Sequence, residues 1–364
     1  MSQSIVINRM PVRVWRRPRV NEIEVLLNPA QSSASPESFV IENPEELMLS
    51  RQIPETGFKN RGADYFVPEA LSAFIAGSAA QRHHIRIPRG YAQAAPLVIT
   101  CRLSGAAPVQ SEELYIQAEE GSKACVIIKY YGEDGTPAEH TGITRVTCAP
   151  GSELHLIKLQ SLNKQATHTD AVEAIVDAKA SLTITMAELG AAVSNASCSV
   201  QLAGESAQLK LDVLYLGDGD RKLDMTYRAE HRGKKTLSDI KARGILHGTS
   251  HKVLRDTLDF VKGASGSKGR EEESVLLLGS KARNISVPLL LCGEHDVEGA
   301  HAASSGRLDE DVMFYILSRG ISEEDARKLV AKASFDVILE DIPDEQIREE
   351  IMAAVEESID RRGE

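Results

Sequence analysis

Short β-type runs, broken at nearly regular intervals, are the feature that most limits how this chain can fold. From His83 onward apolar and polar residues alternate, and Gly, Ser, Asp or Pro interrupt the runs. Aligning the serines of four such interruptions, at Ser122, Ser152, Ser181 and Ser206, gives separations of 30, 29 and 25 residues. A two-strand unit that recurs in this way cannot bury its apolar face alone, so the pattern predicts a mainly β chain whose core is a stacked, right-handed parallel β-helix. A β-sandwich or barrel also fits the spacing.

Different patterns flank this core. Residues 1–27 alternate like a strand or an ordered arm, and Asn28–Ser38 has the Ser, Ala and Pro content of a linker. Short helical pieces are expected between Asn43 and Gly77, with start signals at Asn43 and at Pro68. The expected parts are an N-terminal arm, linker and helical region (1–82), a β-helix core (83–306) and a C-terminal helical domain (307–364).

Three helices are predicted after the core. Asp309 is suited to cap the first, which runs to Arg319, and Ser322 opens the second as part of a capping box. The third follows Pro343-Asp344. Apolar stripes that pack in a core or dock a partner are predicted at Ala326, Leu329, Val330 and Ala333 of the second helix and at Ile347, Ile351, Val355 and Ile359 of the third.

Charge and hydropathy exclude several classes of protein. The formal net charge of -11 argues against nucleic-acid binding, which needs clustered positive charge, and the basic cluster Arg13–Arg19 is short and isolated. No apolar run approaches the roughly 20 residues of a membrane-spanning helix, and the first residues lack the apolar core of a signal peptide. We therefore expect a cytoplasmic protein with no nucleic-acid or membrane partner.

The cysteines and the catalytic motifs are equally restrictive. Five cysteines form an odd set without CxxC spacing, which is typical of reduced thiols, and Cys101, Cys125, Cys148 and Cys198 are expected to be small buried hydrophobes. The chain has no GxxxxGK[ST] loop for ATP, no GxSxG elbow and no HExxH motif. The sequence therefore gives little support to an enzyme.

Side-chain chemistry is concentrated between Pro288 and Ile321. Five residues that can bind metal or protons follow one another where an apolar run gives way to a helix: Cys292, Glu294, His295, Asp296 and His301. A strand places residues two apart on one face, so Cys292 and Glu294 are expected to converge, with His301 returning after a turn at Gly299. The alternative is a cysteine packed at a strand end and a histidine capping the next helix.

Three stretches together resemble the SufB/SufD family, the scaffold subunits of the SUF iron–sulfur cluster assembly machinery. They are HHIRIPRGYAQAAPLVI from His83, HRGKKTLSDIKARGIL from His231, and VEGAHAASSGRLDEDVMFYILSRGIS from Val297. The third is the most specific, and the resemblance covers most of the chain from about residue 83 onward. It implies an N-terminal helical region, a parallel β-helix and C-terminal helices, in the order found above.

The resemblance also implies a function and partners. It implies a non-enzymatic scaffold in a SufBCD-type complex, paired through its β-helix with a SufB-type subunit or with itself, and connected indirectly to a cysteine desulfurase system. Its C-terminal helices are expected to dock a SufC-type ABC ATPase, while the chain itself binds no nucleotide. The predicted partner-binding residues are Leu308, Asp309, Phe314, Tyr315, Arg319 and Ile321.

Two departures refine this reading. SufB-type members carry a cysteine after the lysine of the segment GSKARNISVP, whereas this chain has Ala282, so it looks SufD-like. Many SufD members have a cysteine two residues before the histidine, where this chain has Gly299. The implied metal ligands for a transient iron–sulfur cluster are His301, Cys292 and Glu294, since iron prefers thiolate and takes imidazole or carboxylate as weaker ligands.

Two alternatives remain open at the level of sequence. The chain fits a sole, homodimeric cluster scaffold that uses Cys292 as a ligand. It also fits, less well, a β-helical carbohydrate-active enzyme, which needs two carboxylates across a groove and aromatic platforms for sugars. Aromatic residues make up only 4% of the chain, and its one tryptophan, Trp15, lies outside the repeats.

Overall fold

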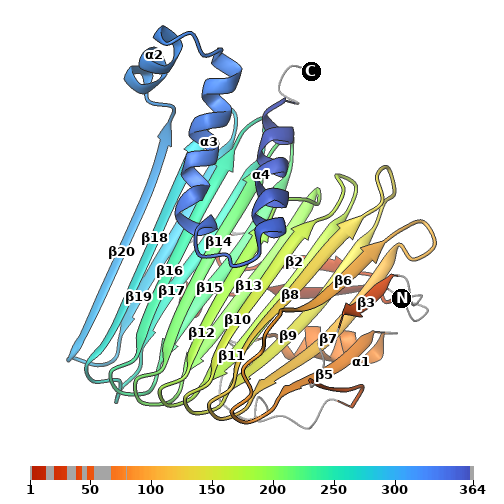
Figure 1. Cartoon of the computed structure of the whole chain (residues 1–364), viewed down its shortest axis with the longest axis vertical. Helices are drawn as coiled ribbons and strands as arrows, with labels where there is room; N and C mark the ends of the chain where they lie inside the picture. Colours follow the sequence, from red (N-terminus) through yellow and green to blue (C-terminus); the bar gives the residue numbers. More distant parts are fainter. Residues whose placement is uncertain are drawn as a thin grey trace.

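The computed structural model describes residues 2–13, 20–30, 38–42, 47–52, 67–78 and 80–360. In this part of the chain, successive strands alternate between two nine-stranded sheets, so each core strand pairs with the strand two places along the sequence. Figure 1 shows the strands stacked side by side into an elongated solenoid. The predicted parallel β-helix is confirmed, because the ladders between core strands are parallel.

The two sheets have the following strands, in spatial order. The first contains β3 Phe39–Glu42, β6 Leu97–Leu103, β8 Lys123–Gly132, β10 Glu153–Ser161, β12 Ser181–Glu188, β14 Gln208–Gly217, β16 Leu237–Leu246, β18 Ser267–Leu277 and β20 Val297–Arg307. The second contains β4 Met48–Ser50, β5 Gln81–Ile87, β7 Val109–Ala118, β9 Glu139–Cys148, β11 Thr167–Val176, β13 Val193–Leu202, β15 Lys222–His231, β17 His251–Phe260 and β19 Arg283–Cys292. The short strand β3 pairs antiparallel with β6, and the short strand β4 pairs antiparallel with β5. These two strands cover the N-terminal end of the solenoid.

The remaining elements lie outside the solenoid. An antiparallel pair, β1 Gln3–Ile7 and β2 Ile23–Leu27, confirms the predicted strand-like arm. The helices are α1 Glu69–Gly77, α2 Glu310–Ser318, α3 Glu323–Leu339 and α4 Glu345–Asp360. The three predicted C-terminal helices are confirmed, with Asp309 and Ser322 as the N-caps of α2 and α3. None of the helices among the described residues is long and apolar enough to span a membrane.

The register corrects the predicted repeat. Lys123 pairs with Glu153, Glu153 with Ser181, and Ser181 with Gln208, so these coils are 30, 28 and 27 residues long. The alignment by serines was therefore wrong beyond Ser152, since Ser181 already belongs to a strand. What recurs is backbone conformation: a residue with positive φ turns the chain in each coil, at Gly121, Gly151, Lys179, Ser206, Lys235 and Gly266.

Both outer faces of the solenoid are partly covered. The arm and α1 pack on the sheet of odd-numbered strands, where Leu71 and Leu27 join one apolar cluster with Ile143. The helices α3 and α4 pack on the other sheet, where Phe335 and Ile351 join another apolar cluster. The helices α3 and α4 are therefore fixed to the side of the solenoid, as Figure 1 shows.

Some expectations about the flanking parts were wrong or lie outside the described residues. Residues 48–50 form a strand instead of a helical piece, because they extend the β5 sheet edge. On α3, Leu329 is exposed, and the buried face is instead formed by Ala326, Ala331, Phe335, Ile338 and Leu339. The helix start at Asn43, residues 31–37 of the linker and residues 14–19 of the basic cluster, Trp15 included, lie outside the described residues.

The interior of the solenoid is apolar but contains isolated polar clusters. The predicted buried positions of Cys101, Cys148 and Cys198 are confirmed, while Cys125 is half-buried and Cys292 is exposed. All five thiols are free. Burial of the first three among aliphatic side chains agrees with their interpretation as small hydrophobes.

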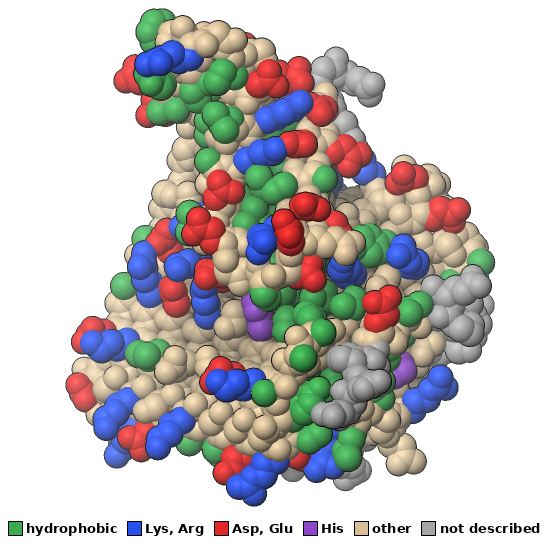
Figure 2. Space-filling model, in the orientation of Figure 1, with side chains coloured by type: hydrophobic (Ala, Val, Ile, Leu, Met, Phe, Trp, Pro, Cys, Tyr) green, Lys and Arg blue, Asp and Glu red, His purple; other side chains and the backbone are tan. Residues whose placement is uncertain are grey.

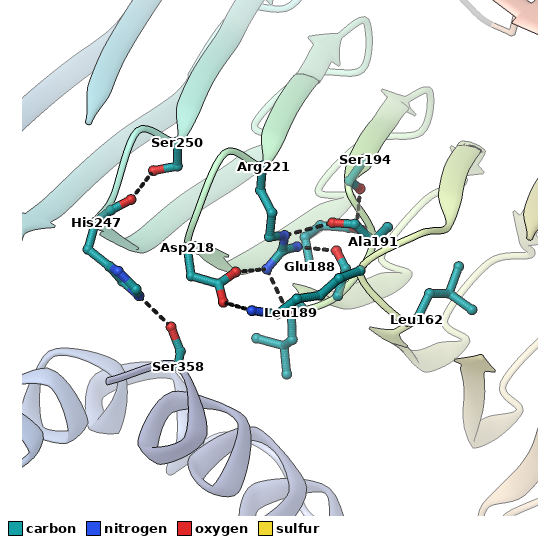
Figure 3. A network of polar contacts seen from close by, with 12 residues as sticks. Leu162, Glu188, Leu189, Ala191, Ser194, Asp218, Arg221, His247, Ser250 and Ser358 are labelled. Carbon is teal, nitrogen blue, oxygen red and sulfur yellow. Dashed lines mark hydrogen bonds and ion pairs between the residues drawn. The ribbon is translucent and has the colours of Figure 1, made fainter. Parts of the chain in front are cut away.

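One polar network joins the turns at the rim to the C-terminal helices. Arg221 is buried and donates hydrogen bonds to the carbonyl groups of residues 189 to 191, while Asp218 balances its charge. Close by, Nε2 of His247 lies 2.7 Å from Oγ of Ser358 on α4 (Figure 3). These contacts satisfy turn carbonyls that the strand ladders leave unpaired, and they fix α4 to the rim.

Candidate functional site

The C-terminal end of the solenoid presents two uncovered strands. β20 pairs with β18 along one edge, and β19 pairs with β17 along one edge. Neither strand pairs along its other edge with any strand in the described part of the chain. Every residue of β20 except Val297 is exposed. An edge of this length, with free backbone donors and acceptors, is suited to pairing with another chain.

His301 lies in the middle of β20 and faces the axis of the solenoid. It is the register partner of Glu271 on β18, and paired residues of parallel strands point to the same side of a sheet. The side chain of Glu271 is buried in the interior, so His301 continues an inward-facing row. His301 is nevertheless exposed, because no further coil among the described residues covers it.

The expected turn before His301 is not at Gly299. Gly299 lies inside β20, and the chain turns earlier, at residues 293 to 296. A Cβ atom at Gly299 would lie 2.7 Å from Cδ1 of Leu290 and 3.1 Å from Cε2 of Phe260. A larger residue at this position would therefore require the side chain of Leu290 to move.

A buried group of carboxylates lies one coil below His301. Glu271, Glu273 and Asp256 surround a single ammonium group, that of Lys252, which forms an ion pair with Glu273. Tyr215 also donates to Glu273, over 2.6 Å. Burial raises the pKa of Glu271 to about 7, and burial together with Glu271 and Glu273 raises that of Asp256. This end of the interior therefore holds protons on carboxyl groups near neutral pH.

Sequence reasoning did not identify this carboxylate group. Three consecutive glutamates, Glu271 to Glu273, were the available signal, since an acidic run inside an alternating strand forces at least one carboxylate inward. Lys252 and Asp256 come from the other sheet, on β17, the strand that directly precedes β18 in the sequence. Only the three-dimensional register brings them together.

The other two predicted ligands have separate surroundings. Cys292 is the last residue of β19, exposed, and the register partner of Phe260. Glu294 lies in the following turn, where its carboxylate accepts the backbone N–H groups of Gly263 at 3.0 Å and His295 at 2.8 Å. These two hydrogen bonds lower the pKa of Glu294. Cys292, Glu294 and His301 do not form a group with mutually close ligand atoms within this chain.

The predicted partner-binding residues lie on and around α2, which projects beyond the end of the sheets (Figure 1). Phe314 is 76% exposed and Tyr315 is 58% exposed, with the guanidinium of Arg319 stacked 4.9 Å from the Tyr315 ring centre. Ile321 is also exposed, whereas Leu308 packs partly against the α3 and α4 cluster. Asp309 caps α2 by accepting two backbone N–H groups. Figure 2 shows the apolar side chains gathered on this projecting helix.

These features define a parallel β-solenoid with an uncovered C-terminal end and an apolar helix projecting beside it. The family model described as "SUF system FeS cluster assembly, SufBD core domain" matches residues 101–334, well over half of the chain. The chain belongs to this SufBD family. Membership supports a role in iron–sulfur cluster assembly over the carbohydrate-active alternative.

Individual relatives have modest sequence identity. An iron–sulfur cluster assembly SufBD family protein of Mycobacterium tuberculosis is 27% identical over 320 residues, 86% of this chain and 78% of the relative. The iron–sulfur cluster assembly protein SufD of Escherichia coli is 26% identical over 328 residues, 84% and 76% of the two chains. The iron–sulfur cluster assembly protein SufD of Bacillus subtilis is 28% identical over 161 residues, which are 44% of this chain and 37% of the relative.

Proposed function

We propose that the chain is a non-enzymatic, SufD-like scaffold subunit on which iron–sulfur clusters assemble at His301. The observation that carries this proposal is the position of His301, on the inward row of an edge strand and exposed at the open end. An imidazole in this position can bind iron while a second chain supplies further ligands. Ligation by nitrogen in place of thiolate is weak enough for a cluster to leave later.

The second chain is proposed to pair with the open edges of β19 and β20. A SufB-type subunit is favoured, because this chain places no thiolate beside His301 and has Ala282 where SufB-type members have cysteine. Self-pairing is the second candidate. Self-pairing is supported by the exposed thiol of Cys292, which ends β19 at the same open end of the solenoid as His301. Cys292 would then supply the sulfur ligand.

The ATPase partner is proposed to bind α2. The exposed rings of Phe314 and Tyr315 and the side chain of Ile321 form an apolar surface of the kind that central interface contacts use. Because α2 packs on α3 and α3 packs on β14 and β16, force on α2 has a short path to the solenoid. ATP-driven closure of the ATPase pair would strain the paired solenoids and open the site at His301.

Replacement of His301 tests the proposed site. In the complex isolated anaerobically from its host, His301→Ala should retain its protein partners but hold about ten-fold less iron and sulfide, since one ligand is lost. His295→Ala is the matched control, because His295 is exposed in the turn at the same end. Wild-type cluster content in the His301→Ala complex would contradict the role. Loss of iron in Cys292→Ser, with no second scaffold recovered, would favour the homodimer.

Replacement of Phe314 tests the docking surface. Phe314→Asp should reduce co-purification of the ATPase about thirty-fold, because a charge at the centre of an apolar interface costs 2 kcal/mol or more. The control is Val337→Asp, which places the same charge at an exposed apolar position of α3. Equal recovery of the ATPase with the wild type and with Phe314→Asp would rule out α2 as its binding site.

A further inference from the structure

A second group of potential metal ligands lies inside the solenoid, near the end of the sheets opposite to His301. Cys101 on β6, Glu112 on β7 and His140 on β9 place a thiol sulfur, a carboxylate oxygen and a ring nitrogen within 4.8 Å of one another. All three side chains are at most 1% exposed. In the described part of the chain, this is the one group of three such ligands with close atoms.

Hydrogen bonds hold the ring of His140 between Glu112 and His168. Nδ1 of His140 lies 2.9 Å from Nδ1 of His168, so one ring donates to the other. A neutral ring at His168 can accept this hydrogen bond through Nδ1. When His140 donates, its Nε2 lone pair faces Oε2 of Glu112. Two acceptors in contact need a proton or a metal ion between them.

This arrangement is the one that metal-bound histidines adopt. Such a histidine binds the ion through one nitrogen and donates the N–H of the other to an acceptor, which fixes the ring. His168 occupies the position of that acceptor, with its ring stacked 4.7 Å from the ring of His140. Tyr130 donates to the second oxygen of Glu112 over 2.8 Å and so fixes the carboxylate as well.

A glycine makes room for the cluster. Glu112, Gly142 and Asp170 are register partners on three adjacent strands of one sheet. A Cβ atom at Gly142 would lie 2.5 Å from Oε1 of Glu112, 2.8 Å from Oδ1 of Asp170 and 2.9 Å from Cε1 of His140. A glycine in the middle of a strand weakens it unless other groups need the space. Here the space is taken by two carboxylates and an imidazole.

The buried charges also match a divalent cation. Lys158 lies 2.7 Å from Asp170 in a buried ion pair, while Glu112 contacts His140 and Tyr130. The Cys101 thiol donates to Oε1 of Gln110 over 3.3 Å, and a bound metal ion would replace its proton. A divalent ion, the thiolate, both carboxylates and the ammonium group are together neutral, as a buried site requires.

We propose that Cys101, Glu112 and His140 bind one structural divalent transition-metal ion, with His168 orienting the ring of His140. Zinc and ferrous iron accept sulfur, nitrogen and oxygen ligands together, whereas calcium and magnesium take oxygen ligands. The ligands come from three strands of neighbouring coils, β6, β7 and β9, so the ion would bind as these coils fold and would hold them together. This site is independent of the proposed role of His301.

Metal analysis of the full-length chain tests the site. Protein produced with added zinc and iron, then washed with EDTA, should retain one ion per chain. Cys101→Ser and His140→Ala should each lower the metal content about ten-fold or more. Cys198→Ser is the matched control, because Cys198 is an equally buried cysteine of the same interior. A folded wild-type chain free of metal, or equal metal content in all variants, would overturn the proposal.

Cobalt(II) gives a readout that does not depend on the stability of a variant. The wild-type chain refolded with cobalt(II) as the only metal should show near-ultraviolet absorption from thiolate-to-cobalt charge transfer. Cys101→Ser should lose this band and keep the visible bands of the ion. Absence of the charge-transfer band in the folded wild type would refute thiolate binding. Metal content that depends on His301 and not on Cys101 would assign the ion elsewhere and also overturn the site.

Discussion

Gly204→Ala is expected to prevent stable folding, with a loss of more than about 4 kcal/mol in the free energy of unfolding. Gly204 lies in the turn after β13, where its N–H donates to the carbonyl of Val176 in the preceding coil. An added Cβ would overlap the backbone nitrogen and Cα of Ala178. Backbone atoms cannot rotate away as side-chain atoms can, so the two coils would have to separate and lose their hydrogen bond.

Urea denaturation and soluble yield measure this effect. The matched control is Gly77→Ala at the end of α1, where a Cβ meets no atom within 4 Å and φ is not positive. That variant should unfold at the urea concentration of the wild type. Wild-type stability of Gly204→Ala would show that neighbouring coils can move apart at this rim. Gly233, whose Cβ would overlap the carbonyl of Gly204, should behave like Gly204.

The turns between strands show why the fold could be predicted from the sequence and the strand register could not. Strand alternation is a local property with a period of two, and a positive-φ turn is marked by Gly in several coils, so strands and turns can be read from the sequence. The coil length varies, however, and Lys179, Ser206 and Lys235 take the same positive-φ position without being glycine. The serines therefore appeared to mark the repeat and misplaced it after Ser152.

The candidate site at the C-terminal end was partly predictable for the same reason. His301 stood out through the family-like motif, and the prediction that it faces a functional surface remains to be tested. Its buried neighbours were missed, because Glu271 and Asp256 lie on different sheets and meet only across the interior of the solenoid. His140 and His168 likewise stand 28 residues apart, one coil length. Paired histidines at the repeat distance were the signal that would have located the interior cluster.

We expect the free energy of unfolding to depend strongly on pH because of one buried carboxyl group, that of Glu188. This residue ends β12 and is enclosed at the rim, where Ser194 donates to its carboxylate over 2.6 Å (Figure 3). Burial raises its pKa to about 7, although Ser194, Lys158 and Arg221 act in the opposite direction. In the unfolded chain a glutamate titrates near about 4.3.

The direction of the effect follows from these two values. Below about pH 4 both states carry the proton, so the folded protein keeps the full contribution of the neutral Glu188. As pH rises, the unfolded chain ionises first, and the contribution is lost by the time pH passes the folded value of about 7. A difference of this size corresponds to about 4 kcal/mol at most, since one pKa unit is about 1.4 kcal/mol.

Glu188→Gln isolates this contribution, because an amide keeps an acceptor for Ser194 and does not ionise. The free energy of unfolding of the variant, minus that of the wild type, should rise by about 2 to 3 kcal/mol between pH 4.5 and pH 7.5. Glu153→Gln is the control, since it removes a solvent-facing carboxylate from the neighbouring strand β10, and its difference should lack this rise. A constant difference for Glu188→Gln would mean that the buried carboxylate is already ionised throughout this range. The charges of Lys158 and Arg221 would then outweigh its burial, and the rim of the solenoid would be more polar than its packing indicates.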